Sequence, residues 1–310
     1  MTLLDESASG VFVIAVTPFG EDGALDLDST DRLVDFYLER GVTGITVLGM
    51  MGEAPKLTAE EARVFVRRVL RRLDGRVPVV VGVSSPGLAS MRELSAAVMD
   101  DGAAGVMVAP PGTVRTDDQI HGYYQGVAEA LGPRTPFVLQ DYPLSTGVQI
   151  APPVINRIVA EVPGCVMLKH EDWPGLAKIS ALRAASDRGE TRRISILTGN
   201  GGLFLPEELG RGADGAMTGF AWPEMMVDVW RAHASDEVER AHDLFDAYLP
   251  LARYEQQPGF GLAVRKHLLA RRGAIASAAL RKPGPRLTPD DIAEIDRLVA
   301  RQERRLKEIG

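Results

Sequence analysis

Cysteine is almost absent from this chain of 310 residues, because Cys165 is the only one. A single cysteine excludes an internal disulfide framework, and its place within an apolar run predicts a reduced, buried thiol. An excess of positive charge is also absent: the formal net charge is -7, whereas a nucleic-acid partner would favour a basic patch. The composition therefore argues against a disulfide-stapled scaffold and against a nucleic-acid-binding protein.

Long apolar runs are missing as well. No run approaches the roughly 18 residues that a membrane-spanning helix needs. Residues 1–9 contain neither the basic region nor the apolar region of a secretory signal. We therefore expect a cytoplasmic protein without a membrane partner. Hydrophobic residues make up 45% of the chain, which is typical of globular proteins, and the length suits one large α/β domain with an appendage or two smaller domains.

A regular alternation of short apolar runs and amphipathic segments fills the first three quarters of the chain. The apolar runs predict strands at residues 11–16, 44–48, 77–83, 105–109, 136–140, 165–169, 194–197 and 213–218. Each is followed by an expected helix, and some of these helices begin with capping signals, such as the capping box of Thr58 and Glu61. Eight strand-then-helix units with short loops predict an α/β protein with a (β/α)8 TIM barrel rather than an open sheet.

The strand pattern stops after about residue 235. Residues 237–251, 260–272 and 289–307 predict three helices without strands between them. Thr288 and Asp291 form another helix-capping signal. We therefore expect a barrel over residues 1–234 and a C-terminal helical appendage over residues 235–310, packed against the barrel and available for subunit contacts.

Lys169 stands at the carboxyl end of the sixth expected strand, directly after four apolar residues. Ligands of parallel α/β proteins bind at the carboxyl ends of the strands. A lysine held there is partly desolvated, which favours the nucleophilic amine that Schiff-base chemistry on a carbonyl substrate needs. The alternative is a lysine whose head reaches solvent at a strand end.

Three polar residues, His170, Glu171 and Asp172, follow the lysine. They do not have a metal-ligand spacing, and adjacent side chains point in different directions. We therefore expect a solvated loop here and no metal site.

The segment Gly49-Met50-Met51-Gly52-Glu53 ends the second expected strand, on the same side of the barrel as Lys169. Glycines let a backbone approach a ligand closely, and successive N–H groups can cradle a carboxylate. The alternative is a plain turn in which the two methionines fill space.

Gln140 and Tyr142 end the fifth expected strand, beside the strand of Lys169. Alternation places both side chains on one face and Asp141 on the other. A phenol at this point could pass protons to or from an imine, or its ring could simply pack at the barrel rim. Other candidates for contact with a ligand follow later strands: Thr146, Thr198, Asn200, Met217 and Thr218.

Together these residues resemble the dihydrodipicolinate synthase and N-acetylneuraminate lyase family of class I aldolases and dehydratases, over almost the whole chain. The shared motifs are Thr17-Pro18-Phe19 with Asp22-Gly23, the Gly-x-x-Gly-Glu motif at 49–53, Pro143 with Thr146-Gly147, and Lys169. The resemblance implies that Lys169 forms a Schiff base with pyruvate or another 2-keto acid. It also implies a homo-oligomer, a dimer or a tetramer, and we expect no cofactor.

Departures from the family pattern concern the groups that move protons. Met50 and Met51 replace a residue whose hydroxyl helps the family's proton relay, and leave only backbone donors. The family's imine tyrosine matches Gln140, which is neither an acid nor a base at neutral pH. The synthase's arginine matches Ser145, and its partner-subunit tyrosine falls near Pro111-Gly112. The resemblance therefore implies a lyase other than dihydrodipicolinate synthase.

The resulting hypothesis is a lyase in which Lys169 condenses with a 2-keto acid and the loop at 49–52 binds its carboxylate. Tyr142 would replace the usual tyrosine as proton shuttle, and Gln140 would orient a water or a substrate hydroxyl. The methionines favour an apolar second substrate or leaving group, such as an aryl or alkyl aldehyde. Two alternatives stay open: a dehydratase of sugar-derived keto acids, and a barrel that binds a small carboxylic acid without turning it over.

Overall fold

A closed barrel of eight parallel strands forms the centre of the computed structural model, which describes residues 2–310. Each strand pairs with the next along the chain, and β8 pairs with β1. The strands are β1 (Gly10–Ile14), β2 (Gly44–Val47), β3 (Val79–Gly82), β4 (Gly105–Val108), β5 (Phe137–Asp141), β6 (Cys165–His170), β7 (Ser195–Thr198) and β8 (Gly215–Ala216). The predicted (β/α)8 barrel is confirmed.

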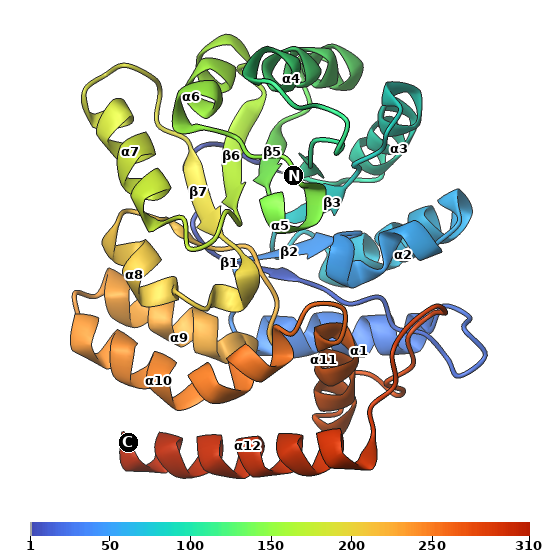
Figure 1. Cartoon of the computed structure of the whole chain (residues 1–310). Coiled ribbons are helices and arrows are strands. Elements are labelled where there is room, and N and C mark those ends of the chain that lie inside the picture. The colour runs from blue at the N-terminus through green and yellow to red at the C-terminus, as the bar shows by residue number, and fades with distance from the viewer. Residues whose placement is uncertain (1) are drawn as a thin grey trace.

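Helices surround the barrel and connect its strands (Figure 1). They are α1 (Leu27–Glu39), α2 (Ala59–Leu73), α3 (Leu88–Asp100), α4 (Asp117–Leu131), α6 (Pro152–Glu161), α7 (Leu176–Asp187), α8 (Leu205–Gly210) and α9 (Pro223–Ala234). Four further short helical turns follow the carboxyl ends of β2, β5 and β7: η1 (Met50–Gly52), η2 (Ala54–Lys56), α5 (Pro143–Thr146) and η3 (Asn200–Gly202).

Local sequence signals explain much of this pattern. The predicted capping box starts α2, where the Thr58 hydroxyl accepts from the Glu61 N–H and the Glu61 carboxylate accepts from the Thr58 N–H. Strand β8 is shorter than the expected run at 213–218, and Thr218 lies beyond its end. The short helix α5 was not expected, although Pro143 at its first position is a residue that favours a helix start.

Alternation along the strands divides the core into two parts. One set of side chains packs outward against the helices. The other set fills the barrel interior with large apolar side chains: Phe12, Ile14, Val80, Met107, Val138, Val166, Met167, Leu197 and Met217, with Leu4 of the N-terminal segment beside them. The barrel is therefore a packed core whose chemistry is confined to its ends.

Three helices follow the barrel, as predicted: α10 (Val238–Glu255), α11 (Gly261–Arg271) and α12 (Pro289–Glu308). Figure 1 shows α12 across the bottom of the view, with α10 and α11 between it and the barrel. The buried Arg265 of α11 donates to Glu255 of α10 and to the backbone oxygen of Gly219, beyond β8. None of the helices within residues 2–310 is long and apolar enough to cross a membrane.

Candidate active site

Lys169 lies near the carboxyl end of β6 and its side chain is buried, with 5% of the residue exposed. In the barrel it is level with Gln140 of β5 on one side and with Leu197 of β7 on the other. The strand position predicted for this lysine is therefore confirmed.

A carboxylate lies next to the lysine. The Nζ atom of Lys169 is 3.0 Å from Oε2 of Glu171, and both side chains are buried. Gln140 donates from Nε2 to the same oxygen at 2.7 Å. One carboxylate oxygen thus joins the lysine to the glutamine that replaces the family's tyrosine.

The expectation of a solvated loop after Lys169 is wrong. Glu171 is 6% exposed, His170 is 2% exposed, and only Asp172 is partly exposed. The reason is that the extended backbone of β6 continues past the lysine, since the Glu171 N–H donates to the Asp141 oxygen at 2.8 Å. Alternation then returns Glu171 to the same face as Lys169.

The neighbouring strand end shapes the slot in which Glu171 lies. Asn200 donates from Nδ2 to the Glu171 backbone oxygen at 3.0 Å. A Cβ atom built on Gly199 would lie 2.1 Å from Cγ of Glu171, so only glycine fits at that position. Glu171 was not predicted as a site residue, although its alternate spacing with Lys169 was a signal for it. Gly199 lies in the glycine-containing segment around Thr198 and Asn200 that was expected to face a ligand.

Tyr142 directly follows β5 and is partly buried at the start of α5. Burial, and then the negative charge of Glu171, raise the pKa of the Tyr142 phenol above its usual value. The phenol therefore stays protonated at neutral pH and lies close enough to Glu171 to sense its charge. The structure thus groups Lys169, Glu171, Gln140 and Tyr142 at one end of the barrel.

The predicted carboxylate-binding loop forms the turn η1 at the end of β2. Within it the Gly52 N–H donates to the Gly49 oxygen and the Glu53 N–H donates to the Met50 oxygen. Met50 and Met51 are the first two residues of the turn, so their N–H groups have no partner within it. These two backbone donors are the candidates for binding a carboxylate.

The other predicted contact residues have structural partners. The Thr146 hydroxyl donates to the Tyr142 oxygen and accepts from the Val148 N–H. The Thr218 hydroxyl accepts from the Gly201 N–H at 2.8 Å, which ties η3 to the end of β8. Met217 is fully buried in the barrel interior. Their predicted role in substrate binding stays a prediction.

Other buried or partly buried titratable residues include Glu208 of α8, Asp141 of β5 and Lys178 of α7. Burial raises the pKa of Glu208 to about 7, against the opposing effects of Thr198 and His170. Asp141 of β5 accepts a 2.8 Å hydrogen bond from Lys178. Within the described residues 2–310, no group of His, Cys, Asp and Glu is arranged to hold a metal ion.

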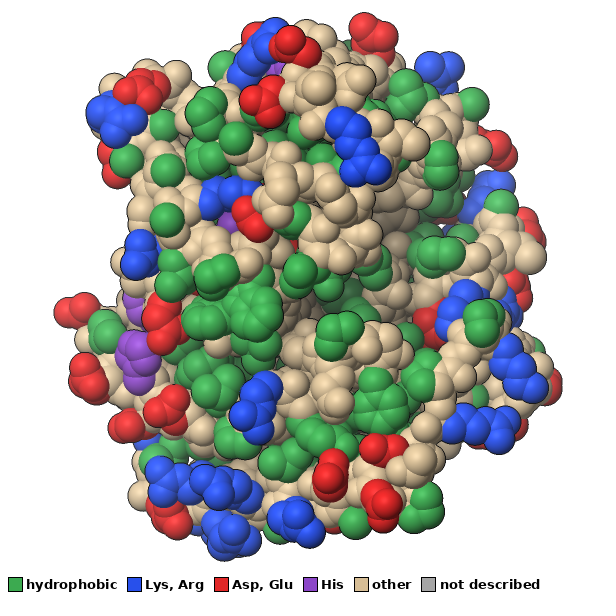
Figure 2. All heavy atoms as spheres, in the orientation of Figure 1, with side chains coloured by type: hydrophobic (Ala, Val, Ile, Leu, Met, Phe, Trp, Pro, Cys, Tyr) green, Lys and Arg blue, Asp and Glu red, His purple; other side chains and the backbone are tan. Residues whose placement is uncertain are grey.

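Apolar side chains gather around a hollow on the face that bears α5 (Figures 1 and 2). Met50, Leu144 and Trp173 are the large exposed apolar residues in the loops that follow β2, β5 and β6, and Trp173 packs against Phe204. A cavity of about 1160 Å³ lies at the amino-terminal end of the barrel and includes Leu4 and Arg67 in its lining. That cavity does not include Lys169 or Glu171, so the site is assigned to the carboxyl ends of the strands.

Comparison with known proteins identifies the family of this chain. The family model described as the dihydrodipicolinate synthetase family matches residues 7–302. An L-2-keto-3-deoxyarabonate dehydratase from Azospirillum brasilense is 34% identical over 295 residues, which cover 92% of each chain. A 4-hydroxy-tetrahydrodipicolinate synthase from Sorangium cellulosum is 33% identical over 95% of this chain and 97% of its own.

A solved structure is also similar over nearly its whole length. The crystal structure of a dihydrodipicolinate synthase from Rhodopseudomonas palustris has a TM-score of 0.95 and 53% identity, over 97% of this chain and 100% of the other. The closed barrel of eight parallel strands agrees with this structural similarity. The chain therefore belongs to the dihydrodipicolinate synthetase family and is an enzyme of the class I aldolase or dehydratase type.

Proposed function

We propose that this enzyme removes water from a 2-keto-3-deoxy sugar acid through a Schiff base on Lys169, with Glu171 moving the protons. The observation that carries the proposal is the Glu171 oxygen shared by Lys169 and Gln140. It supplies a proton-transfer group at a site that lacks the family's tyrosine. The resemblance to a protein named L-2-keto-3-deoxyarabonate dehydratase supports the substrate class.

Imine formation is the first step. The lysine amine attacks the C2 carbonyl carbon, and the C2 oxygen leaves as water after taking up two protons. Glu171 lies 3.0 Å from Nζ, within the distance that general acid–base transfer requires, and can accept a proton from the amine and return it to the departing oxygen.

Elimination is the second step. The imine draws electrons from C3, so a base can remove a C3 proton and leave an enamine. The electron pair then expels the C4 hydroxyl, which takes a proton and leaves as water. Hydrolysis of the imine consumes one water and frees Lys169, so the net change is the loss of one water from the substrate.

Gln140 and the loop at 49–52 position the reactants. Gln140 holds the Glu171 carboxylate with a 2.7 Å hydrogen bond, and it has no titratable proton of its own. The N–H groups of Met50 and Met51 bind the substrate carboxylate. Tyr142 stays a candidate for the leaving-group proton, because its protonated phenol lies near Glu171.

A second candidate is an aldolase that joins or releases an apolar aldehyde. The exposed side chains of Met50, Leu144 and Trp173 favour it, because they offer an apolar surface beside the mouth of the barrel. Both candidates begin with the same imine.

Two further expectations stay predictions from the sequence. They are that the chain forms a homo-oligomer, and that the barrel gives way to the C-terminal helical region at about residue 235.

Borohydride trapping tests the Schiff base. The protein is incubated with pyruvate and with 2-keto-3-deoxypentonates, reduced, and its intact mass is measured. We expect one adduct on the wild type, none on Lys169→Ala, and an adduct on Lys178→Met. Lys178 is a partly buried lysine that pairs with Asp141 and serves as the matched control. Absence of an adduct with every 2-keto acid would contradict the proposed function.

Dehydration tests Glu171. We expect Glu171→Gln to lower the rate of water loss by about 100-fold or more, the range of a general acid–base contribution. Glu208→Gln, a buried glutamate of α8, is the matched control and should stay close to the wild-type rate. If Glu171→Gln dehydrates at the wild-type rate, Glu171 does not have this role. If no substrate loses water but aldehydes are released, the aldolase candidate is favoured.

A further inference from the structure

We propose that Glu53, held by Lys266 and by residues 279–281, positions the loop that binds the substrate carboxylate. Lys266 and residues 279–281 belong to the C-terminal region, so this region takes part in substrate binding without touching the substrate. The binding role of the loop rests on the proposed function, whereas the contacts that hold it do not.

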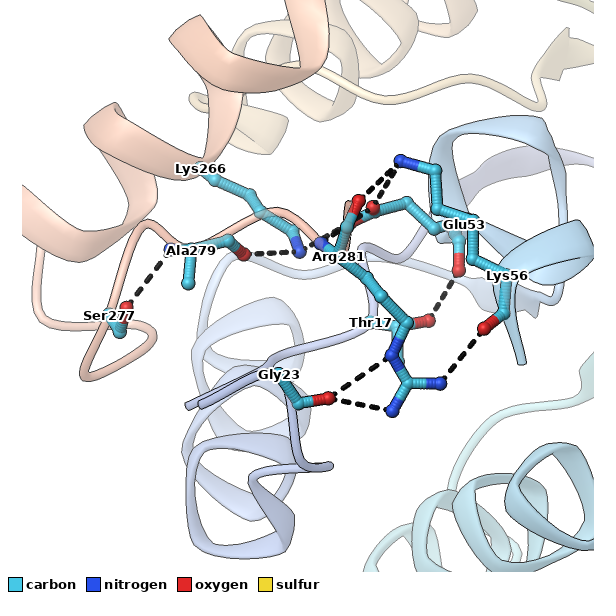
Figure 3. Close-up of polar contacts among 9 residues, drawn as sticks. Thr17, Gly23, Glu53, Lys56, Lys266, Ser277, Ala279 and Arg281 are labelled. Carbon is cyan, nitrogen blue, oxygen red and sulfur yellow. Dashed lines mark hydrogen bonds and ion pairs between the residues drawn. The ribbon is translucent and has the colours of Figure 1, made fainter. Parts of the chain in front are cut away.

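Glu53 is the last residue of the Gly-x-x-Gly-Glu motif, and its side chain is almost fully buried. Its Oε1 atom accepts from Nζ of Lys266 in α11 at 2.6 Å. Its Oε2 atom accepts from Nζ of Lys56 at 2.8 Å and from the Arg281 N–H at 3.1 Å. Three donors on two oxygens satisfy the buried carboxylate, as burial of a charge requires (Figure 3).

The backbone of Glu53 provides a second observation. Its φ of 54° and ψ of 29° are in the left-handed region, which is unfavourable for a residue with a side chain. Such a conformation persists only where the surroundings impose it. The Glu53 N–H donates to the Met50 oxygen and closes η1, so the same residue that is held by the cations also ends the turn.

Residues 279–281 run alongside this loop and bond to it repeatedly. Lys266 also donates to the Ala279 oxygen at 2.9 Å, and Lys56 donates to the Arg281 oxygen at 2.8 Å. The Arg281 guanidinium donates to the Lys56 oxygen and forms two hydrogen bonds to the Glu61 carboxylate. The segment therefore follows the loop from Glu53 to the start of α2.

The loop after β1 also contacts the loop at 49–53 and the segment 279–281. The Thr17 hydroxyl donates to the Gly52 oxygen at 2.6 Å, and Arg281 donates to the Gly23 oxygen. Two cations lie over the ring of Phe19, with Lys266 at 4.5 Å and Arg281 at 4.6 Å from its ring centroid. Figure 3 shows Thr17 and Gly23, Glu53 and Lys56, and the C-terminal Lys266 and Arg281 meeting from three parts of the chain.

The consequence for binding follows from the position of the free donors. The N–H groups of Met50 and Met51 open η1, and Gly52 and Glu53 close it. If Glu53 moves, the turn loses its last bond and the two donors lose their fixed direction. Binding of a carboxylate by backbone N–H groups depends on that direction, so the loss should appear as weaker substrate binding.

The test uses the full-length protein and the variants Lys266→Met and Glu53→Gln. Borohydride trapping is measured over a range of pyruvate concentrations. In both variants we expect the half-saturating pyruvate concentration to rise about tenfold and the maximal trapping rate to stay within about threefold of wild type. This is the result expected when a variant weakens substrate binding and leaves the chemical step intact. Arg272→Met is the matched control, because Arg272 joins the C-terminal region to Glu224 of α9 and does not contact Glu53. Lys266→Arg should recover much of the binding.

Hydrogen exchange of the peptide at 49–57 gives a readout that needs no activity. We expect exchange there to be about tenfold faster in Lys266→Met than in Arg272→Met, both measured well below their melting temperatures. Unchanged exchange, or an unchanged half-saturating concentration in a folded variant, would overturn the proposal. If the wild type forms no adduct, the proposed function fails, and exchange alone then decides whether Lys266 and Glu53 hold the loop.

Discussion

Lys169 lies near the carboxyl end of β6 and Glu171 lies one residue beyond that end, and their Nζ and Oε2 atoms are 3.0 Å apart. Alternate residues of a strand face the same side, so one strand supplies both the amine and the carboxylate. The pair exists because the extended backbone continues past Lys169 and bonds to Asp141 of β5. The geometry of the reaction centre is therefore set by strand pairing rather than by a flexible loop.

Gly199→Ala should disable the enzyme without unfolding it. The added Cβ would lie 2.1 Å from Cγ of Glu171, so the carboxylate must move away from Lys169. A displacement of this kind costs about 100-fold in rate. Steady-state dehydration kinetics check this. Gly122→Ala, at an exposed position of α4 with open space around its Cβ, should keep full activity and gain about 1 kcal/mol of stability.

Gln140→Leu should separate imine formation from proton transfer. The variant removes the 2.7 Å hydrogen bond that holds Glu171 and leaves a buried carboxylate with one partner fewer. We expect the free energy of unfolding to fall by about 1–3 kcal/mol. The borohydride adduct on Lys169 should still form while water loss slows. An unchanged dehydration rate would show that Gln140 does not position Glu171.

Glu208→Gln should change the pH dependence of stability. Burial raises the pKa of Glu208 from 4.5 to about 7, so between these values the folded protein holds a proton that the unfolded chain has lost. The stabilising contribution of Glu208 to the free energy of unfolding is complete below pH 4.5 and is lost as the pH rises through about 7. In the wild type, this titration lowers the free energy of unfolding by on the order of 3 kcal/mol.

Urea denaturation at several pH values measures this effect. The Gln side chain does not titrate, so the stability of Glu208→Gln relative to wild type should increase from pH 5 to pH 8. If the free energies of unfolding of variant and wild type differ by the same amount at every pH, Glu208 does not titrate in this range.

The thiol of Cys165 should be inert in the native protein. Burial is the largest effect on this thiol and raises its pKa to about 12, so almost no nucleophilic thiolate forms at neutral pH. We expect iodoacetamide to leave the folded protein unlabelled and to add one group after denaturation in guanidinium. Rapid labelling of the native protein would show that the start of β6 opens to solvent.

The sequence alone determined the barrel and the place of the lysine. Short apolar runs and capping residues such as Thr58 and Glu61 act over a few residues, so they predict local elements directly. The position of Lys169 after an apolar run placed it at the carboxyl end of a parallel strand. These conclusions needed only local periodicity and the rule for where such barrels bind ligands.

Only the tertiary structure decided which charged groups meet. Glu171 was expected in solvent, and it became a partner of Lys169 because pairing between β5 and β6 carried the extended backbone past the lysine. Glu53 and Lys266 are 213 residues apart in the sequence, and no local pattern marks them as a pair. Buried charges are partnered by whatever the fold brings beside them, and this depends on packing over the whole chain.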